Sequence, residues 1–126
     1  MKPISAAAAA LLAFLIAGAA PGHHASNLDY DEDNIGTIEG TVQDIFWSNP
    51  HIHFYLTVIN DDGESEVWDM EGPNLSSLGR QNVTRDSVQI GETIEITGTL
   101  GRDGRKRIWA TTIRKPDGSI VMGERP

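Results

Sequence analysis

The chain has 126 residues, a formal net charge of −8 and no cysteine. This length fits one small domain, and the absence of cysteine excludes disulfides, thiolate metal sites and thiol nucleophiles. The negative charge repels polyanions over most of the surface, so we expect no general binding of nucleic acid.

The first 22 residues have the pattern of an export signal. Lys2 supplies a positive start, residues 4–19 are apolar or small, and Pro21 and Gly22 follow. A membrane anchor is less favoured, because the strongly apolar part is shorter than the ~20 residues of a spanning helix. We therefore expect a periplasmic or secreted protein, cut after residue 19 or residue 22. Only the second cut makes His23 the first residue.

Residues 23–36 are polar and show neither helical nor strand periodicity. Four carboxylates between positions 29 and 33 make this segment acidic. We interpret it as an exposed arm that precedes a folded domain over residues 37–122, with residues 123–126 as a tail.

Alternating carboxylates in the arm, Asp29, Asp31 and Asp33, could wrap a calcium ion. However, Asn34 and Gly40 occupy the positions where an EF-hand loop requires glycine and a bidentate glutamate. A solvated acidic segment is the simpler interpretation. The carboxylates could instead support a histidine metal site by hydrogen bonding to the histidines that bind the metal.

Residues 37–60 predict two long strands joined at Ser48-Asn49-Pro50, because β-branched and aromatic residues fill both halves. In the first half the alternation shifts by one position near Gln43-Asp44, which indicates a β-bulge. The second half predicts two faces. One carries Ile52, Phe54, Leu56 and Val58, and the other carries His51, His53, Tyr55 and Thr57.

The rest of the chain alternates short strands with turns that contain glycine or proline. We expect a turn at residues 60–63 and then a strand over 64–70 with Trp68 and Met70 inward. A short helix follows, capped by Asn74 and ending at Gly79, with Leu75 and Leu78 inward, and a single turn lies at 84–87.

The last part of the chain predicts a strand after Gly91 with Ile94 and Ile96 inward, a turn at Asp103-Gly104 and a strand over 107–114. A turn at 116–118 and a short strand with Ile120 and Val121 complete the order.

Three strands, a short helix and two or three further strands are the order expected of an OB-like small β-barrel with five to six strands. The fold class is therefore all-β with one short helix. An open β-sandwich is the alternative, and the helix in the middle of the chain favours the barrel.

Short motifs spread along the mature chain add a family resemblance. They are His23-His24, Tyr30-Asp31, Gly40-Thr41-Val42, Trp47-Ser48-Asn49-Pro50-His51, Asp62-Gly63, Trp68 with Glu71, Pro73-Asn74-Leu75, Thr84-Arg85-Asp86-Ser87 and Gly91-Glu92. With these motifs the chain resembles small exported bacterial proteins of domain-of-unknown-function family 6152. Val83 and Ile90 depart from the aromatic residue and the proline expected there. The resemblance implies a secreted, compact β-rich protein and carries no agreed activity.

All four histidines fall into two pairs, His23-His24 and His51 with His53. Neutral imidazole is a good ligand for copper and zinc, and two histidines at i and i+2 on one strand face can share a metal. A cut before His23 would add its free amine. The simpler alternative is that His51 and His53 are half-exposed strand residues, with His51 bonded to the Asn49-Pro50 corner.

A basic group lies at the turn before the fifth strand, where Arg102, Arg105, Lys106 and Arg107 occur together. In OB-like barrels this loop often flanks the ligand groove, so these cations could meet an anionic ligand or lipid. A charged hairpin that keeps a sheet edge soluble is the commoner role.

Aromatic side chains near the first corner could stack on a ligand, although a core of this size needs as many. The candidate ligand-binding residues are Asn49, Trp47, Tyr55, Arg105 and Arg107. No nucleophile motif or phosphate loop is present, so we assign no catalytic residue. The expected function is an exported envelope module that binds copper, zinc or a small ligand through its histidines. The alternative is a non-catalytic subunit that docks on an envelope membrane protein.

Overall fold

The computed structural model describes residues 26–123, so the predicted export signal, His23 and His24, and residues 124–126 lie outside the described part. No helix between residues 26 and 123 is long and apolar enough to span a bilayer. The elements in chain order are α1 Ser26–Asp29, β1 Tyr30–Phe46, β2 His53–Ile59, β3 Ser65–Glu71, α2 Leu75–Arg80, a 3-10 turn at Arg85–Ser87, β4 Thr93–Gly101, a 3-10 turn at Arg102–Gly104, β5 Arg107–Arg114 and β6 Ile120–Met122.

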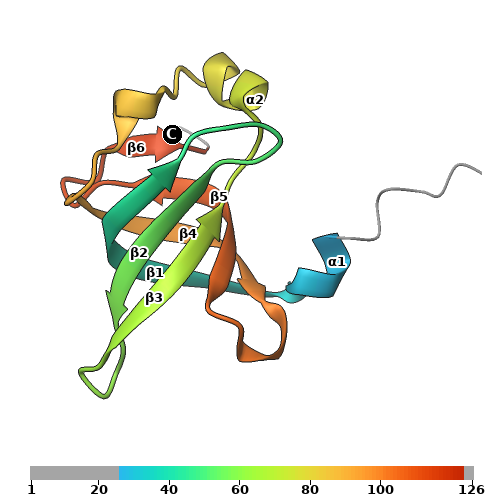
Figure 1. Ribbon diagram of the computed structural model, residues 1–126, viewed down its shortest axis with the longest axis vertical. Helices are drawn as coiled ribbons and strands as arrows, with labels where there is room; N and C mark the ends of the chain where they lie inside the picture. Colours follow the sequence, from blue (N-terminus) through green and yellow to red (C-terminus); the bar gives the residue numbers. More distant parts are fainter. Residues whose placement is uncertain (1–25, 124–126) are drawn as a thin grey trace, which may run out of the picture.

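The six strands form a single sheet in the order β3-β2-β1-β4-β5-β6. Neighbours in this order are antiparallel, and an additional parallel pairing of β3 with β5 joins the sheet into a ring (Figure 1). The predicted all-β class is confirmed, and α2 lies between β3 and β4 as the OB-like order requires. The two separate sheets of a sandwich are not formed in the described part of the chain.

The strand β1 is long enough to pair with two partners because it bends. Its first part pairs with β4 and its second part with β2, and the register with β2 shifts between Val42 and Asp44. This shift is the predicted bulge. A side chain at Gly40 would come within 2.9 Å of the Thr57 carbonyl oxygen, so glycine permits the close approach of β1 and β2.

The predicted strand start is wrong, because β1 begins at Tyr30 rather than Thr37 and α1 precedes it. Tyr30 pairs with Gly101 of β4, and regular pairing resumes only at Ile35. The side chains between these two points are mostly exposed and polar, so they lack the alternation by which a half-buried strand is recognised.

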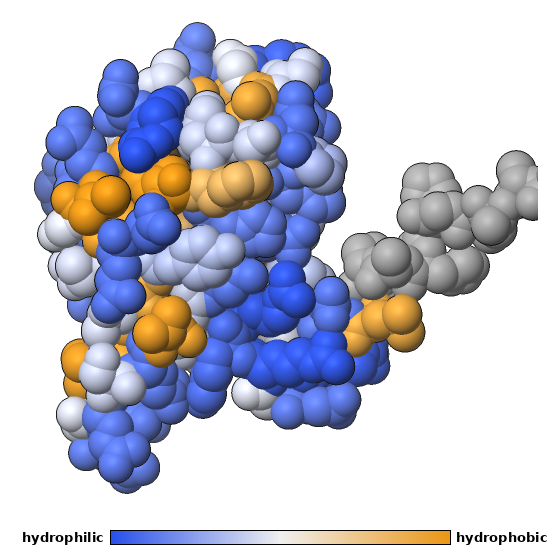
Figure 2. Space-filling model, viewed as in Figure 1, coloured by the Kyte–Doolittle hydropathy of each residue, from blue (hydrophilic) through white to orange (hydrophobic). Residues whose placement is uncertain are grey.

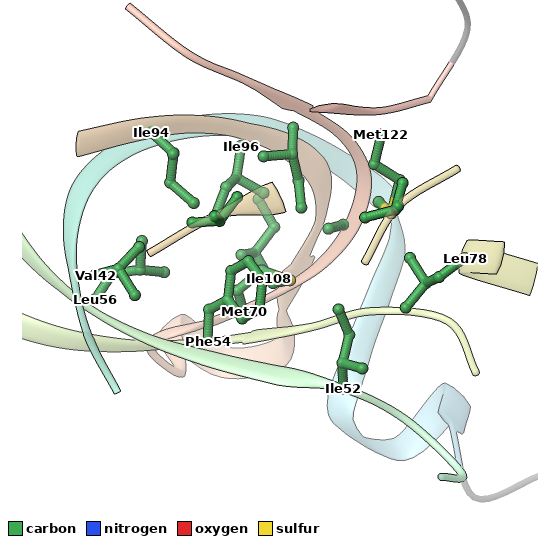
Figure 3. Close-up of a cluster of buried hydrophobic side chains, with 14 of the residues drawn as sticks. Val42, Ile52, Phe54, Leu56, Met70, Leu78, Ile94, Ile96, Ile108 and Met122 are labelled. Carbon is green, nitrogen blue, oxygen red and sulfur yellow. The ribbon is translucent and has the colours of Figure 1, made fainter. Parts of the chain in front are cut away.

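The interior of the ring holds the predicted apolar side chains (Figure 3). Phe54 and Met70 are at most 2% exposed, and Ile94 and Ile96 are fully buried. The indole of Trp68 is only partly buried and packs against this core from one side.

The helix α2 begins as predicted, since the Asn74 side chain accepts a hydrogen bond from the Ser77 N–H at 2.8 Å. Its predicted end at Gly79 is wrong. The helix continues to Arg80, and the chain leaves it through Asn82, whose φ of 58° is in the left-handed region that asparagine tolerates. The single turn after Thr84 is confirmed.

Candidate functional site

The two histidines of the first corner lie on the outer face of the ring. His53 pairs with Glu71 of β3, and the parallel pairing sets Glu71 beside Trp109 of β5. Side chains at paired positions share a face, so β2, β3 and β5 present their polar residues together. We call this group the His–carboxylate cluster, and it consists of Tyr30, His51, His53, Asp69, Glu71 and Arg107.

Each imidazole of the cluster is held by its own carboxylate. The Nδ1 atom of His51 lies 2.6 Å from Oε1 of Glu71, and the Nδ1 atom of His53 lies 2.8 Å from Oδ1 of Asp69. An ionised carboxylate can only accept, so Nδ1 donates in both pairs. In a neutral ring the lone pair then lies on Nε2, which makes Nε2 the atom that can bind a cation.

The second oxygen of Glu71 accepts a hydrogen bond from the Tyr30 hydroxyl at 2.5 Å. Tyr30 is 5% exposed, and its ring meets Trp109 edge to face with centroids 6.1 Å apart. Burial and the Glu71 carboxylate raise the pKa of the Tyr30 hydroxyl above its usual value. The phenol therefore stays protonated and fixes Glu71 toward His51.

Arg107 links the carboxylates of the cluster. Its Nη2 atom donates to Oε2 of Glu71 at 3.1 Å and lies 3.6 Å from Oδ2 of Asp69. Its Nη1 atom lies 3.2 Å from Oδ2 of Asp29, and the guanidinium stacks over Tyr30 at 5.0 Å from the ring centroid. The guanidinium holds the two histidine partners at a fixed separation.

The charge balance of this surface favours a positively charged ligand. Arg105 pairs with Asp29 at 2.6 Å, so the cluster with this pair contains three carboxylates and two guanidinium groups. With neutral imidazoles the sum is 2 − 3 = −1. A cation would meet a net attraction here, whereas an anion would be repelled.

The described residues hold no group of three or more histidine, aspartate or glutamate side chains placed around a common metal position. Within residues 26–123 the site thus offers the Nε2 atoms of two imidazoles, and one oxygen each of Glu71 and Asp69 already accepts a hydrogen bond from Nδ1. A complete coordination sphere would need ligands from elsewhere. His23 and His24, which we expected to supply them, lie outside the described residues.

The cations of the basic hairpin have partners within the molecule. Arg102 donates to the Tyr30 carbonyl oxygen at 2.9 Å, and Lys106 lies 3.2 Å from Glu66 and over the ring of Trp68. With Arg105 and Arg107 in the pairs described above, all four cations have partners. This arrangement supports the structural role that we considered for the hairpin.

The other candidate ligand-binding residues occupy different positions. Asn49 accepts a hydrogen bond from the Leu75 N–H at 3.0 Å and so anchors the start of α2. Trp47 packs against the core. Tyr55 lies beside the cluster, where its ring stacks with that of His53 at a centroid distance of 6.3 Å.

Comparison with known protein families covers most of the chain. The model of DUF6152, described as a family of unknown function, matches residues 11–109. The chain belongs to this family. Among the curated proteins compared, none matches the chain. The match extends from the apolar N-terminal run into β5, so this DUF6152 domain includes every member of the His–carboxylate cluster.

Three members of the DUF6152 cluster were missed as site residues: Tyr30, Asp69 and Glu71. The predicted turn at residues 60–63 contained the signal for the two carboxylates, because it places Glu71 opposite His53 in the hairpin. Tyr30 offered no such signal, since its neighbours on β5 are remote in sequence.

Proposed function

We propose that this protein is an exported envelope module that binds a divalent metal ion, copper or zinc, through His51 and His53. The observation that carries the proposal is the pair of Nδ1–carboxylate hydrogen bonds, which leaves both Nε2 atoms as ligands. Histidines that bind metals commonly donate their other ring N–H to a carboxylate, which orients the ring and raises its basicity.

His23 and His24 are the further candidate ligands. Asp29, the last residue of α1, is tied to Arg105 and Arg107, and His24 precedes Ser26, the first residue of this helix, by two positions. The proposal assigns His23 and His24 to the coordination sphere, with the amine of His23 as a further ligand when the signal is cut after residue 22.

Calorimetric titration of the purified mature protein with Cu²⁺ and with Zn²⁺ tests the proposal. We expect one site per chain whose affinity falls as the pH is lowered, because protons compete with the metal for imidazole nitrogen. His51→Ala with His53→Ala should abolish this site. Glu71→Gln should weaken it by about 10–100-fold while both imidazoles remain.

Glu92→Gln is the matched control, since Glu92 is a carboxylate in an ion pair with Lys115 and is not a member of the cluster. It should bind the metal as the parent protein does. Unchanged binding in the His51→Ala, His53→Ala double variant would refute the assignment, and an equal loss in Glu71→Gln and Glu92→Gln would show that the carboxylates act only through general charge.

A further inference from the structure

The first half of β3 is an open edge of the ring. β5 pairs with β3 only from Asp69 onward, whereas Ser65–Trp68 pair with β2 alone. The N–H of Asp69 donates to the Lys106 carbonyl oxygen on the β5 side at 3.0 Å. Backbone groups alternate along a strand, so those of Ser65 and Val67 point to the same side. No strand of the described chain pairs with them there.

A cleft of about 660 Å³ lies beside this edge. The hairpin of β2 and β3 projects beyond the rest of the ring at this end of the molecule (Figure 1). The wall of the cleft includes the apolar side chains of Ile38, Val58, Trp68 and Leu100. A strand added to the edge of β3 would point every second side chain toward this cleft.

The opposite face of the edge offers a second contact. Val67 is 59% exposed on the outer face, where hydrophobic patches interrupt a largely hydrophilic surface over β2 and β3 (Figure 2). An added strand could therefore bury apolar surface on both of its faces.

The charges around the edge are negative. Asp61, Asp62 and Glu64 lie in the hairpin and take part in none of the ion pairs formed within residues 28–123. Among the described residues, the cation nearest to Glu66 is Lys106, across the gap between β3 and β5, and Glu66 also accepts hydrogen bonds from Asn60 and Trp68. Two copies of this edge would repel each other, while a chain with lysine or arginine would be attracted.

From these observations we infer that the open edge of β3 binds an extended, basic segment of a partner protein by strand addition. The partner's backbone pairs with Ser65 and Val67, an apolar side chain enters the cleft beside Trp68, and its cations meet the acidic hairpin. The ion pair of Lys106 with Glu66 opens on binding. It is half exposed on the lysine side and contributes little to stability.

Two synthetic nine-residue peptides with blocked ends test this inference on the mature chain, with a chelator present to separate the result from metal binding. One alternates lysine with valine, and the other alternates glutamate with valine. We expect the lysine peptide to bind at least tenfold more tightly and to protect the amide hydrogens of Ser65 and Val67 from exchange, as followed by NMR.

Val67→Pro removes the Val67 N–H, which points away from β2, and therefore leaves every hydrogen bond between β2 and β3 in place. Proline is tolerated at such a position of an edge strand. Val67→Pro should lower the affinity for the lysine peptide at least tenfold, whereas Val67→Ala should keep most of it. Asp61→Asn with Asp62→Asn alters no strand backbone and should also weaken binding, so the test does not depend on one variant folding.

Equal binding of the two peptides, or undiminished binding by Val67→Pro, would overturn the inference. Sedimentation provides a further test. A dimer of the parent chain that is lost in Val67→Pro would assign the edge to a second copy and would also overturn it, whereas a monomer that binds the lysine peptide supports it.

Discussion

Tyr30 connects the chain's first strand to the site through one hydroxyl group. The Tyr30 side chain is buried where its hydroxyl donates to Glu71. A hydrogen bond to a charged acceptor contributes about 1.5–3 kcal/mol to the free energy of unfolding. The same Glu71 carboxylate holds His51 with its other oxygen. A substitution of Tyr30 therefore affects the His51 imidazole through Glu71, without a direct contact between the two side chains.

We expect Tyr30→Phe to lower the free energy of unfolding by about 1–3 kcal/mol at neutral pH, as measured by urea denaturation. It should also weaken metal binding, because Glu71 loses one of the groups that fix it. Tyr55→Phe is the control, since Tyr55 is exposed on the same face. Equal losses in the two variants would contradict this role of Tyr30.

The raised pKa of Tyr30 predicts an alkaline loss of stability. In the unfolded chain the phenol ionises near its usual value of 10, and in the folded chain it ionises only at higher pH. Between these two values the unfolded state has released its proton and the folded state has not. The free energy of unfolding should therefore fall as the pH rises above about 10.

This loss should be smaller in Tyr30→Phe than in the parent protein. The chain has two tyrosines, so the ultraviolet difference between parent and variant isolates the Tyr30 phenolate. We expect this signal to appear only above the usual tyrosine range in the folded protein and near pH 10 in urea. A Tyr30 signal at the ordinary pH in the folded protein would contradict the burial argument.

At the scale of elements, the pairing of β4 with β5 depends on one glycine. The register shifts between Thr97 and Gly98, and a side chain at Gly98 would collide with the backbone carbonyl of Trp109. Backbone cannot move aside as a flexible side chain can. The shift also brings β5 to the position from which Arg107 meets the carboxylates of β3.

Gly98→Ala should therefore lower the free energy of unfolding by about 1–3 kcal/mol or more, measured by denaturant titration. Gly79→Ala is the contrasting variant, because Gly79 lies within α2 and a side chain there meets nothing within 4 Å. It should raise stability by about 0.5–1 kcal/mol. Destabilisation by both substitutions would show that glycine is required for flexibility rather than for close approach.

At the scale of the whole molecule, the parallel pairing of β3 with β5 joins one end of the sheet to the strand next to its other end, and so closes the sheet around one core. Met70 pairs with Ile108 in this closure, and both side chains are fully buried. Three outer residues of the same pairing, Asp69, Glu71 and Arg107, belong to the His–carboxylate cluster. Packing inside the ring and the site outside it therefore depend on the same contact.

We expect Ile108→Ala to lower the free energy of unfolding by about 2–5 kcal/mol, a large part of the stability of a small domain. Ile59→Ala removes the same side chain from a position that is 63% exposed and should change stability by less than about 0.5 kcal/mol. Thermal unfolding followed by circular dichroism checks both values. Similar effects of the two variants would mean that the ring closure is not a principal source of stability.

Local patterns predicted most of the elements. Alternation of Phe54, Leu56 and Val58 indicated the buried face of β2, and Asn74 indicated the start of α2. The start of β1 was missed because its first residues are polar on both faces. The single inward residue there, Tyr30, does not make a periodic pattern.

The sequence by itself predicted that His51 and His53 share a side, since residues two apart in an extended segment do. In the structure β2 begins only at His53, and the hydrogen bond to Glu71 places His51 on the same side. The sequence also determined the bulge in β1 and the turns, because these depend on residues close along the chain. Only the tertiary structure decided that Glu71 would receive Tyr30, His51 and Arg107 at once. These residues are 20 to 41 positions from Glu71 in sequence, and closure of the ring through β3 and β5 brings them together.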